Sequence, residues 1–345
     1  MKITSVLAVI FFFVCEVYSQ QDPHFSHYMF NDIFNNPGAS GVEGVTRATL
    51  LHRSQWAGYQ TQGVGDASGA PQTQVLSISH PIKIMASPVV NSGVGLLLVN
   101  DKLGPLRNIN VKASYAYHYK LRNSATLGLG VRAGIYSQGI DGSVLRESEE
   151  GDVVVDQLRT SPTQIRPDLG IGAWYSTRKY YGGISMNHVI GSRFNFGANK
   201  DSLNSKLVQH LYITGGYHLM LGTKLRVTPS SIIQTDFVET SYIYGIVADL
   251  NRYKYWLGFN IRQSVTGKSE NNTSRQITTD DFVFMGGISL LPDKSLRIGY
   301  SFDLVTSGAR AKDYTSHEIM LSYILPLGTD KTPPPLRTPR YRHEN

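Results

Sequence analysis

Residues 111–119 read Val-Lys-Ala-Ser-Tyr-Ala-Tyr-His-Tyr, and residues 127–135 read Leu-Gly-Leu-Gly-Val-Arg-Ala-Gly-Ile. In both stretches one set of alternate residues is mainly apolar or aromatic, and the other set is mainly small or polar. Residues 253–262 and 296–304 repeat the pattern. Alternation sustained over about nine residues predicts a β-strand. A tilted strand of about nine to eleven residues is also long enough to cross a bilayer.

Alternation alone does not tell which face of the sheet points inward, because a soluble sandwich would bury its apolar face. The strand length favours a membrane barrel, and so do aromatic residues near the strand ends, where girdles form at the lipid–water interface. These residues are Tyr115, Tyr117, Tyr119, Tyr253 and Tyr255. The polar face then points into the lumen.

The spacing of the alternating segments predicts about fourteen strands. They begin near Val45, Thr73, Ser92, Asn108, Ala125, Asp168, Tyr180, Lys206, Leu225, Glu239, Tyr253, Asp281, Ser295 and Ser316. Short turns and long connections mostly alternate, as periplasmic turns and outer loops do. Residues 81–91 are long for such a turn, and residues 236–238 are short for such a loop. We therefore expect an all-β fold, a transmembrane antiparallel β-barrel over residues 45–326.

The composition agrees with a large β structure. The chain has 345 residues and 33 glycines, and its charged fraction of 17% lies below the roughly 25% typical of soluble domains. Residues 1–19 resemble a signal peptide and contain Cys15, the only cysteine. No later stretch has the 18 apolar residues of a membrane helix. The net charge of +7 is dispersed without a recognition motif, so we expect no nucleic-acid partner.

The segment before the barrel, residues 20–44, leaves two alternatives open. Apolar residues recur at helical spacing and end before Pro37. They are Phe25, Tyr28, Met29, Ile33 and Phe34. The segment is either a short helix that covers one end of the barrel or a plug that enters the lumen.

Two charged regions are candidate partner-binding sites. Residues 327–345 contain three consecutive prolines together with Arg337, Arg340 and Arg342. This tail is either a solvated terminus or an extended periplasmic docking peptide. The longest expected outer loop carries Glu147, Glu149 and Glu150. It is either a solvated loop or a surface for calcium or a basic partner, although its spacing lacks the EF-hand pattern.

The search for catalytic chemistry is mostly negative. The sequence contains no Gly-x-Ser-x-Gly elbow, P-loop or His-Glu-x-x-His motif. His210 and His218 would lie some 25 Å apart on one strand, too far to share a metal. We expect no enzyme activity, metal or cofactor. Inward charges should pair across the lumen, because burying an unpaired charge is costly. The candidates are Lys112, Arg132, Lys254, Arg262, Arg297, Asp303 and Glu318.

Several sequence blocks, in order along the chain, carry a family resemblance. They include Asn36-Pro37-Gly38-Ala39-Ser40-Gly41, Arg53-Ser54-Gln55-Trp56 and Gly69-Ala70-Pro71-Gln72-Thr73. Residues 93–104, 114–117 and 316–321 complete the set. From about residue 21 to residue 325 the chain resembles the PorP/SprF family of Bacteroidota outer-membrane proteins.

This resemblance implies an outer-membrane barrel of the type IX secretion and gliding-motility machinery, with outer-membrane lipid around it. It also implies two protein partners: a periplasmic ring of PorK/PorN type and the C-terminal domains of surface proteins that the barrel exports or holds. The alternative is a general solute channel, similar to a porin. A scaffold barrel predicts a blocked lumen, whereas a channel predicts an open polar pore.

Overall fold

The computed structural model describes residues 22–57, 70–82, 90–121, 124–145, 153–196, 203–266, 276–291, 295–306 and 315–325. Within these ranges, no helix has both the length and the apolar character needed to cross a membrane. The expected signal peptide and the proline-rich tail lie outside them.

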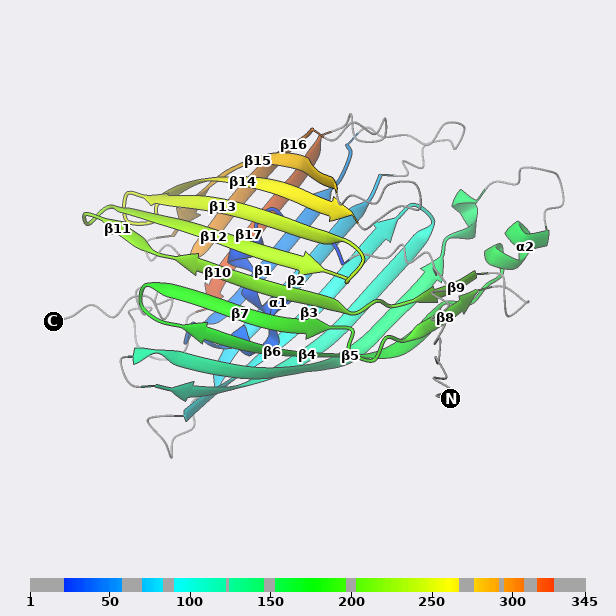
Figure 1. The fold of residues 1–345 in the computed structure, drawn as a ribbon, viewed down its shortest axis with the longest axis horizontal. Helices are drawn as coiled ribbons and strands as arrows, with labels where there is room; N and C mark the ends of the chain where they lie inside the picture. The colour runs from blue at the N-terminus through cyan, green and yellow to red at the C-terminus, as the bar shows by residue number, and fades with distance from the viewer. Residues whose placement is uncertain are drawn as a thin grey trace, which may run out of the picture.

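Long antiparallel strands form the wall of the molecule (Figure 1). They are β1 (Thr46–Ser54), β2 (Gln72–Ile82), β3 (Val90–Leu103), β4 (Leu106–Lys120), β5 (Thr126–Ile140), β6 (Gln164–Ser176), β7 (Tyr180–Asn187), β10 (His210–Tyr217), β11 (Leu219–Leu221), β12 (Leu225–Thr235), β13 (Thr240–Leu250), β14 (Tyr255–Thr266), β15 (Gln276–Leu290), β16 (Leu296–Val305) and β17 (Ser316–Leu325).

The wall closes on itself. β1 pairs with both β2 and β17, and β10 pairs with both β7 and β12. β10 and β11 are one strand interrupted at His218, since both pair with β12. The described residues therefore form a closed barrel of fourteen strands, which confirms the fold expected from the sequence. A closed antiparallel sheet satisfies its backbone hydrogen bonds without an edge, as a membrane barrel requires.

The barrel wall places apolar side chains outside and polar side chains inside, the reverse of a soluble β-sandwich. On β5, Leu129 and Val131 expose 54% and 57% of their surface, whereas the intervening Gly130 and the next residue, Arg132, are buried. β4 repeats this order, with Tyr115 and Tyr117 exposed and Lys112 and His118 buried. On these two strands the apolar set thus faces outward, and the small and polar set faces the lumen.

The two ends of the barrel differ. At the end that we call the loop end, the strand pair β8 (Arg193–Phe196) and β9 (Leu203–Lys206) and the helices η4 (Gly142–Val144) and α2 (Val153–Arg159) extend beyond the wall (Figure 1). The opposite, turn end carries short connections such as residues 177–179. The expected anomaly at residues 236–238 is real: β12 and β13 meet there in a short turn at the loop end.

Residues 22–44, which we call the luminal segment, run inside the ring of strands from the loop end to the turn end (Figure 1). The segment contains three short helical turns, η1 (Tyr28–Phe30), α1 (Asp32–Asn35) and η2 (Pro37–Ala39). Phe25 and Phe34 pack against inward apolar side chains of the wall, including Leu51 and Trp256. The core of the molecule is therefore the contact between this segment and the inner wall.

Candidate functional site: a segment held in the lumen

A buried ionic cluster on β1, β16 and β17 binds the start of the luminal segment. Nη1 of Arg53 lies 2.7 Å from Oδ2 of Asp303 and 3.3 Å from Oε2 of Glu318, and all three side chains are almost fully buried. Nδ1 of His27 lies 2.7 Å from Oε1 of Glu318. We call Arg53, Asp303, Glu318 and His27 the ionic cluster. Arg53 is the near cation of both carboxylates, while Arg262 lies 3.9 Å from Asp303. The luminal segment supplies most of their remaining hydrogen bonds.

Backbone groups of the luminal segment complete this cluster. The N–H groups of Ser26 and His27 donate to the two oxygens of Glu318, at 2.8 and 2.9 Å. The Ser26 hydroxyl accepts from Arg53 and donates to Asp303, both at 2.9 Å. Asn260 on β14 donates to the carbonyl of Ser26 at 2.9 Å. A buried charge is tolerated only with such partners, so this wall and this segment require each other.

Arg132 on β5 holds the middle of the segment in a different way. Its guanidinium donates to the carbonyls of Ile33 and Phe34, the latter at 3.0 Å, and lies 3.3 Å from Oδ1 of Asn187. The expectation that Arg132 pairs with an opposite charge across the lumen is therefore wrong. The last carbonyls of the short helix α1 have no hydrogen-bond partner within the helix and need donors from elsewhere. Arg132 provides these donors.

The next turn of the segment lies against glycines of the wall. Nδ2 of Asn36 donates to the carbonyls of Ala173 and Ile184, at 2.9 and 3.1 Å, and Oδ1 of Asn36 accepts from the N–H of Gly38 at 2.8 Å. A Cβ atom at Gly130 would lie 2.4 Å from backbone atoms of residues 37 and 38. Glycine is required there because the two backbones approach closely.

Further lumen-facing glycines repeat this contact along the segment. They are Gly93, Gly128, Gly172 and Gly183, on β3, β5, β6 and β7, where a Cβ would lie 1.9 to 2.6 Å from atoms of residues 36–40. We call these four together with Gly130 the glycine wall. It receives the Asn36–Ser40 turn by shape rather than by charge.

The first described residue, Asp22, is held at the loop end. Its carboxylate lies 2.8 Å from Nε2 of His188 and accepts from the Tyr212 hydroxyl at 2.6 Å. The N–H of Asp22 donates to Nε2 of His210 at 3.2 Å, and Gln234 donates to its carbonyl. Among the described residues, this trio of Asp22, His188 and His210 brings three metal-ligand atoms within 4.8 Å of one another.

The remaining expected lumen charges pair with acids that the sequence did not single out. Lys112 lies 2.6 Å from Asp168, and Arg262 forms a close ion pair with Asp281. Arg297 lies 3.0 Å from Asp249. These partners come from strands one, two or three positions away in the wall.

Some expected residues do not belong to the lumen. The prediction that Lys254 points into the lumen is wrong. Lys254 is exposed in the turn between β13 and β14, and its ammonium lies 5.3 Å from the ring of Tyr255. Glu147, Glu149 and Glu150, like Arg337, Arg340 and Arg342, lie outside the described residues, so their roles remain predictions.

Sequence reasoning missed several residues that hold the segment. Arg53 was not recognised as a charge of the lumen, and Asp22 and His188 were not grouped with His210. One signal was available in the sequence: Arg53 and Glu318 both stand in blocks that carry the family resemblance. In the structure they are directly paired in register between β1 and β17. The contacts of Asp22 join residues more than 160 positions apart, which spacing cannot reveal.

The outward apolar faces, the closed wall and the polar lumen define a membrane β-barrel of the outer-membrane type, with a segment of its own chain in the lumen. The family model described as "Type IX secretion system membrane protein PorP/SprF" matches residues 17–323. The chain belongs to this family. Family and fold together indicate a secretion or transport barrel rather than an enzyme.

Solved structures with a similar fold include a FadL homologue and a hydrocarbon channel. A FadL homologue of Pseudomonas aeruginosa is 11% identical, with a TM-score of 0.48, over 84% of this chain and 93% of that one. The monoaromatic hydrocarbon channel CymD is 11% identical, with a TM-score of 0.45, over 85% and 91%. A search of curated proteins finds no match.

Proposed function

We propose that this chain is an outer-membrane component of the type IX secretion and gliding-motility machinery that binds cell-surface proteins through their C-terminal domains and exports or anchors them. In this proposal, residues 1–19 are a signal peptide that is removed, the barrel spans the outer membrane, and the loop end faces outward. The tail of residues 327–345 then lies in the periplasm, and no catalytic step or cofactor is involved.

The observation that supports this proposal best is the luminal segment. It fills the barrel with contacts that are ionic at Glu318 and sterically close at Gly130. A barrel that serves as a scaffold gains rigidity from such a filling, whereas a solute channel would have to displace it. Membership of a type IX secretion family agrees with the same assignment.

The first experiment tests the cargo. A chain with an affinity tag inserted in a loop is purified from outer membranes, and the C-terminal domain of a surface protein from the same organism is tested for co-purification. A deletion strain is tested for the amount of that protein at the cell surface. We expect capture of the domain and loss of the surface protein. Failure of both results contradicts the proposal.

The channel alternative has its own measurement. Purified protein is inserted in planar bilayers, and its steady conductance is compared with that of a porin. The proposal predicts little steady current, because the luminal segment occupies the pore. A large steady conductance, with normal surface proteins in the deletion strain, would favour a solute channel instead.

We further propose that Arg337, Arg340 and Arg342 contact the periplasmic ring of PorK/PorN type, and that Glu147, Glu149 and Glu150 contact the cargo or a basic partner. Deleting residues 332–345 should reduce recovery of the ring and leave cargo capture intact. Replacing the three glutamates with glutamine should have the opposite pattern. Unchanged recovery of the ring after the deletion removes the docking role of the tail.

A further inference from the structure

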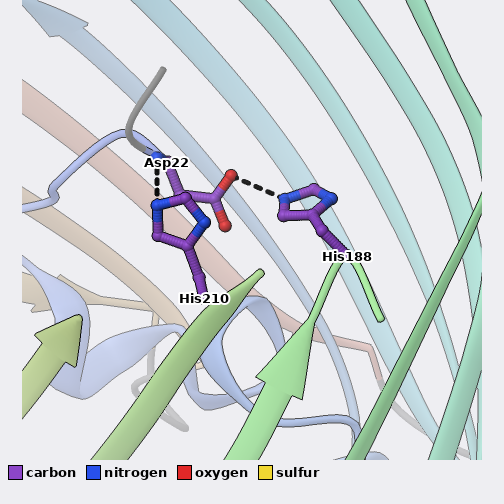
Figure 2. A group of neighbouring side chains, drawn as sticks. All are labelled: Asp22, His188 and His210. Carbon is purple, nitrogen blue, oxygen red and sulfur yellow. Dashed lines mark hydrogen bonds and ion pairs between the residues drawn. The ribbon is translucent and has the colours of Figure 1, made fainter. Parts of the chain in front are cut away.

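The trio of Asp22, His188 and His210 joins the luminal segment to two wall strands at the loop end. Figure 2 shows the Asp22 carboxylate between the two imidazole rings, which come from the end of β7 and the start of β10. Nε2 of His188 lies 2.8 Å from Oδ1 of Asp22, and Nε2 of His210 lies 3.2 Å from the Asp22 nitrogen. Both histidines are buried, and the ligand atoms lie within 4.8 Å of one another.

The outer nitrogens of both rings are already occupied. Nδ1 of His188 faces Oδ2 of Asp168 at 2.9 Å, and Nδ1 of His210 lies 2.9 Å from the carbonyl of Val208. Metal-binding histidines typically donate this second N–H to a carboxylate or a backbone carbonyl, which fixes the tautomer and the ring orientation. In both rings Nε2 is then the nitrogen nearest Asp22. At His210 it accepts from the Asp22 N–H, and at His188 it shares a proton with the Asp22 carboxylate.

The donor set and its spacing suit a divalent transition metal. Two imidazole nitrogens and one carboxylate oxygen are ligands of Zn²⁺ sites, at about 2.0–2.2 Å from the ion. A tetrahedral ion with such bonds sets its ligand atoms about 3.4 Å apart, between the 2.8 Å contact and the 4.8 Å limit found here. The ion would displace the proton now shared between Asp22 and His188.

A small pocket beside His210 has room for about one water molecule, which can serve as a fourth ligand. It is lined by His24 and His210, together with Gln234, Asp236 and Glu239. His24 is half-buried, and its buried Nδ1 atom has no hydrogen-bond partner within the described part of the chain. The cavity wall therefore contains polar atoms that a metal-bound water can satisfy.

We propose that Asp22, His188 and His210 bind one divalent transition-metal ion of the Zn²⁺ type, which clamps the first part of the luminal segment to the loop ends of β7 and β10. Asp168 is a positioning residue, since it orients His188 while its other close contact is Lys112. The site belongs to this chain alone, so its test needs no secretion partner.

The test measures metal on the purified, full-length chain carrying no polyhistidine tag. The protein in detergent at pH 7.5 is equilibrated with ZnCl₂, desalted and analysed for zinc by mass spectrometry. We expect one tightly held Zn²⁺ per wild-type chain and none in H188Q or H210Q. His218→Gln is the matched control, because His218 is a buried lumen histidine bonded to Thr228 away from the trio; it should retain the ion.

Three further measurements keep the result independent of folding. Heat-dependent migration on gels identifies the folded barrel for each variant. Replacing zinc with Co²⁺ should give the intense visible absorption of a tetrahedral site in wild type, and Asp22→Asn should lose it. Asp168→Asn, which removes no ligand, should weaken zinc binding by roughly 10- to 100-fold.

The opposite outcomes overturn the inference. Folded wild-type chain without a saturable site at one ion per chain contradicts it, and so does a folded H188Q/H210Q double variant that still binds one ion. Equal loss of zinc in H218Q would show binding at histidines elsewhere. None of these outcomes bears on cargo capture, so the metal site and the proposed secretion role fail separately.

Discussion

The luminal segment is held by two opposite regions of the wall that use different physics. On β1, β16 and β17, the ionic cluster binds Ser26 and His27 through buried charges. On β3 to β7, the glycine wall receives the Asn36–Ser40 turn through close backbone approach and neutral hydrogen bonds. The first region depends on the pairing of ions, and the second on the absence of side chains.

This difference predicts how each region tolerates change. Removing one partner of a buried ion pair leaves an uncompensated charge, but removing all of them together is often neutral. A side chain added to a close-packed contact has no such remedy, since the backbone has to move. The two regions also have separate reporters: Trp256 contacts His27 at a ring distance of 5.6 Å, and Trp174 packs in one apolar cluster with Ile33 and Ala39 of the segment.

The largest effect should come from Arg53→Met. The change leaves the carboxylates of Asp303 and Glu318 buried without their arginine, at an expected cost of about 3–5 kcal/mol in the free energy of unfolding. Urea titration of the barrel in detergent, followed by the fluorescence of Trp256 in a background with the other tryptophans replaced by phenylalanine, measures it. Planar bilayers should also show increased conductance, as the start of the segment detaches.

A charge-neutral variant sharpens this result. Adding Asp303→Asn and Glu318→Gln to Arg53→Met removes the stranded charges, so most of the lost stability should return. If the triple variant is as unstable as the single one, the ionic cluster acts through packing rather than charge.

The second prediction concerns shape. Gly130→Ala adds a Cβ that would lie only 2.4 Å from backbone atoms of residues 37 and 38, which is too close for unchanged backbones. We expect a loss of about 1–3 kcal/mol and a changed emission of Trp174 with little change at Trp256. Gly182→Ala is the matched control, since its Cβ would meet only an ordinary 3.4 Å contact. Equal effects of both alanines would show that strand propensity, not the close approach, is measured.

The third prediction removes the neutral hydrogen bonds of the same region. Asn36→Ala leaves the carbonyls of Ala173 and Ile184 and the N–H of Gly38 without this partner. The expected loss is about 1–3 kcal/mol, again reported by Trp174. Asn100→Ala, at an exposed pair with Gln74, should change stability by less than about 0.5 kcal/mol. A null effect at Asn36 would assign the holding of the turn to the glycines alone.

The barrel was predictable because its information is local. Alternation on β4 and β5 identifies individual strands, and turn residues such as Leu121 and Thr177 separate them. The fourteen expected strand starts lie within five residues of the observed ones, with the largest difference at β15. Which face points outward followed from strand length and tyrosine position, since a bilayer fixes both.

The contents of the lumen were only partly predictable. Polar residues on the inner face, such as Lys112 and Glu318, follow from the same alternation, but their partners depend on closure and on the luminal segment. Arg132 shows the limit: its partners are backbone carbonyls of residues 33 and 34, and a carbonyl has no signature in the sequence. Gly130 looked like a small lumen residue, whereas its function is to admit another backbone.

The smallest effect should come from a charge pair in water, which tests whether burial gives the ionic cluster its strength. Asp141, just beyond β5, accepts hydrogen bonds from Ser143 and then Arg107, and together they lower the pKa of Asp141 to about 2. Because the folded pKa lies below the unfolded value of about 3.9, the stabilisation is present above about pH 4 and is lost as the pH falls through 2. Asp141→Asn should cost less than about 1 kcal/mol at pH 6, since the pair is partly exposed, and only a small part of that at pH 2, where about half of the folded carboxylates are protonated. Urea titrations of both proteins at the two pH values decide this, and a loss at pH 6 as large as that of Arg53→Met would remove burial as the explanation.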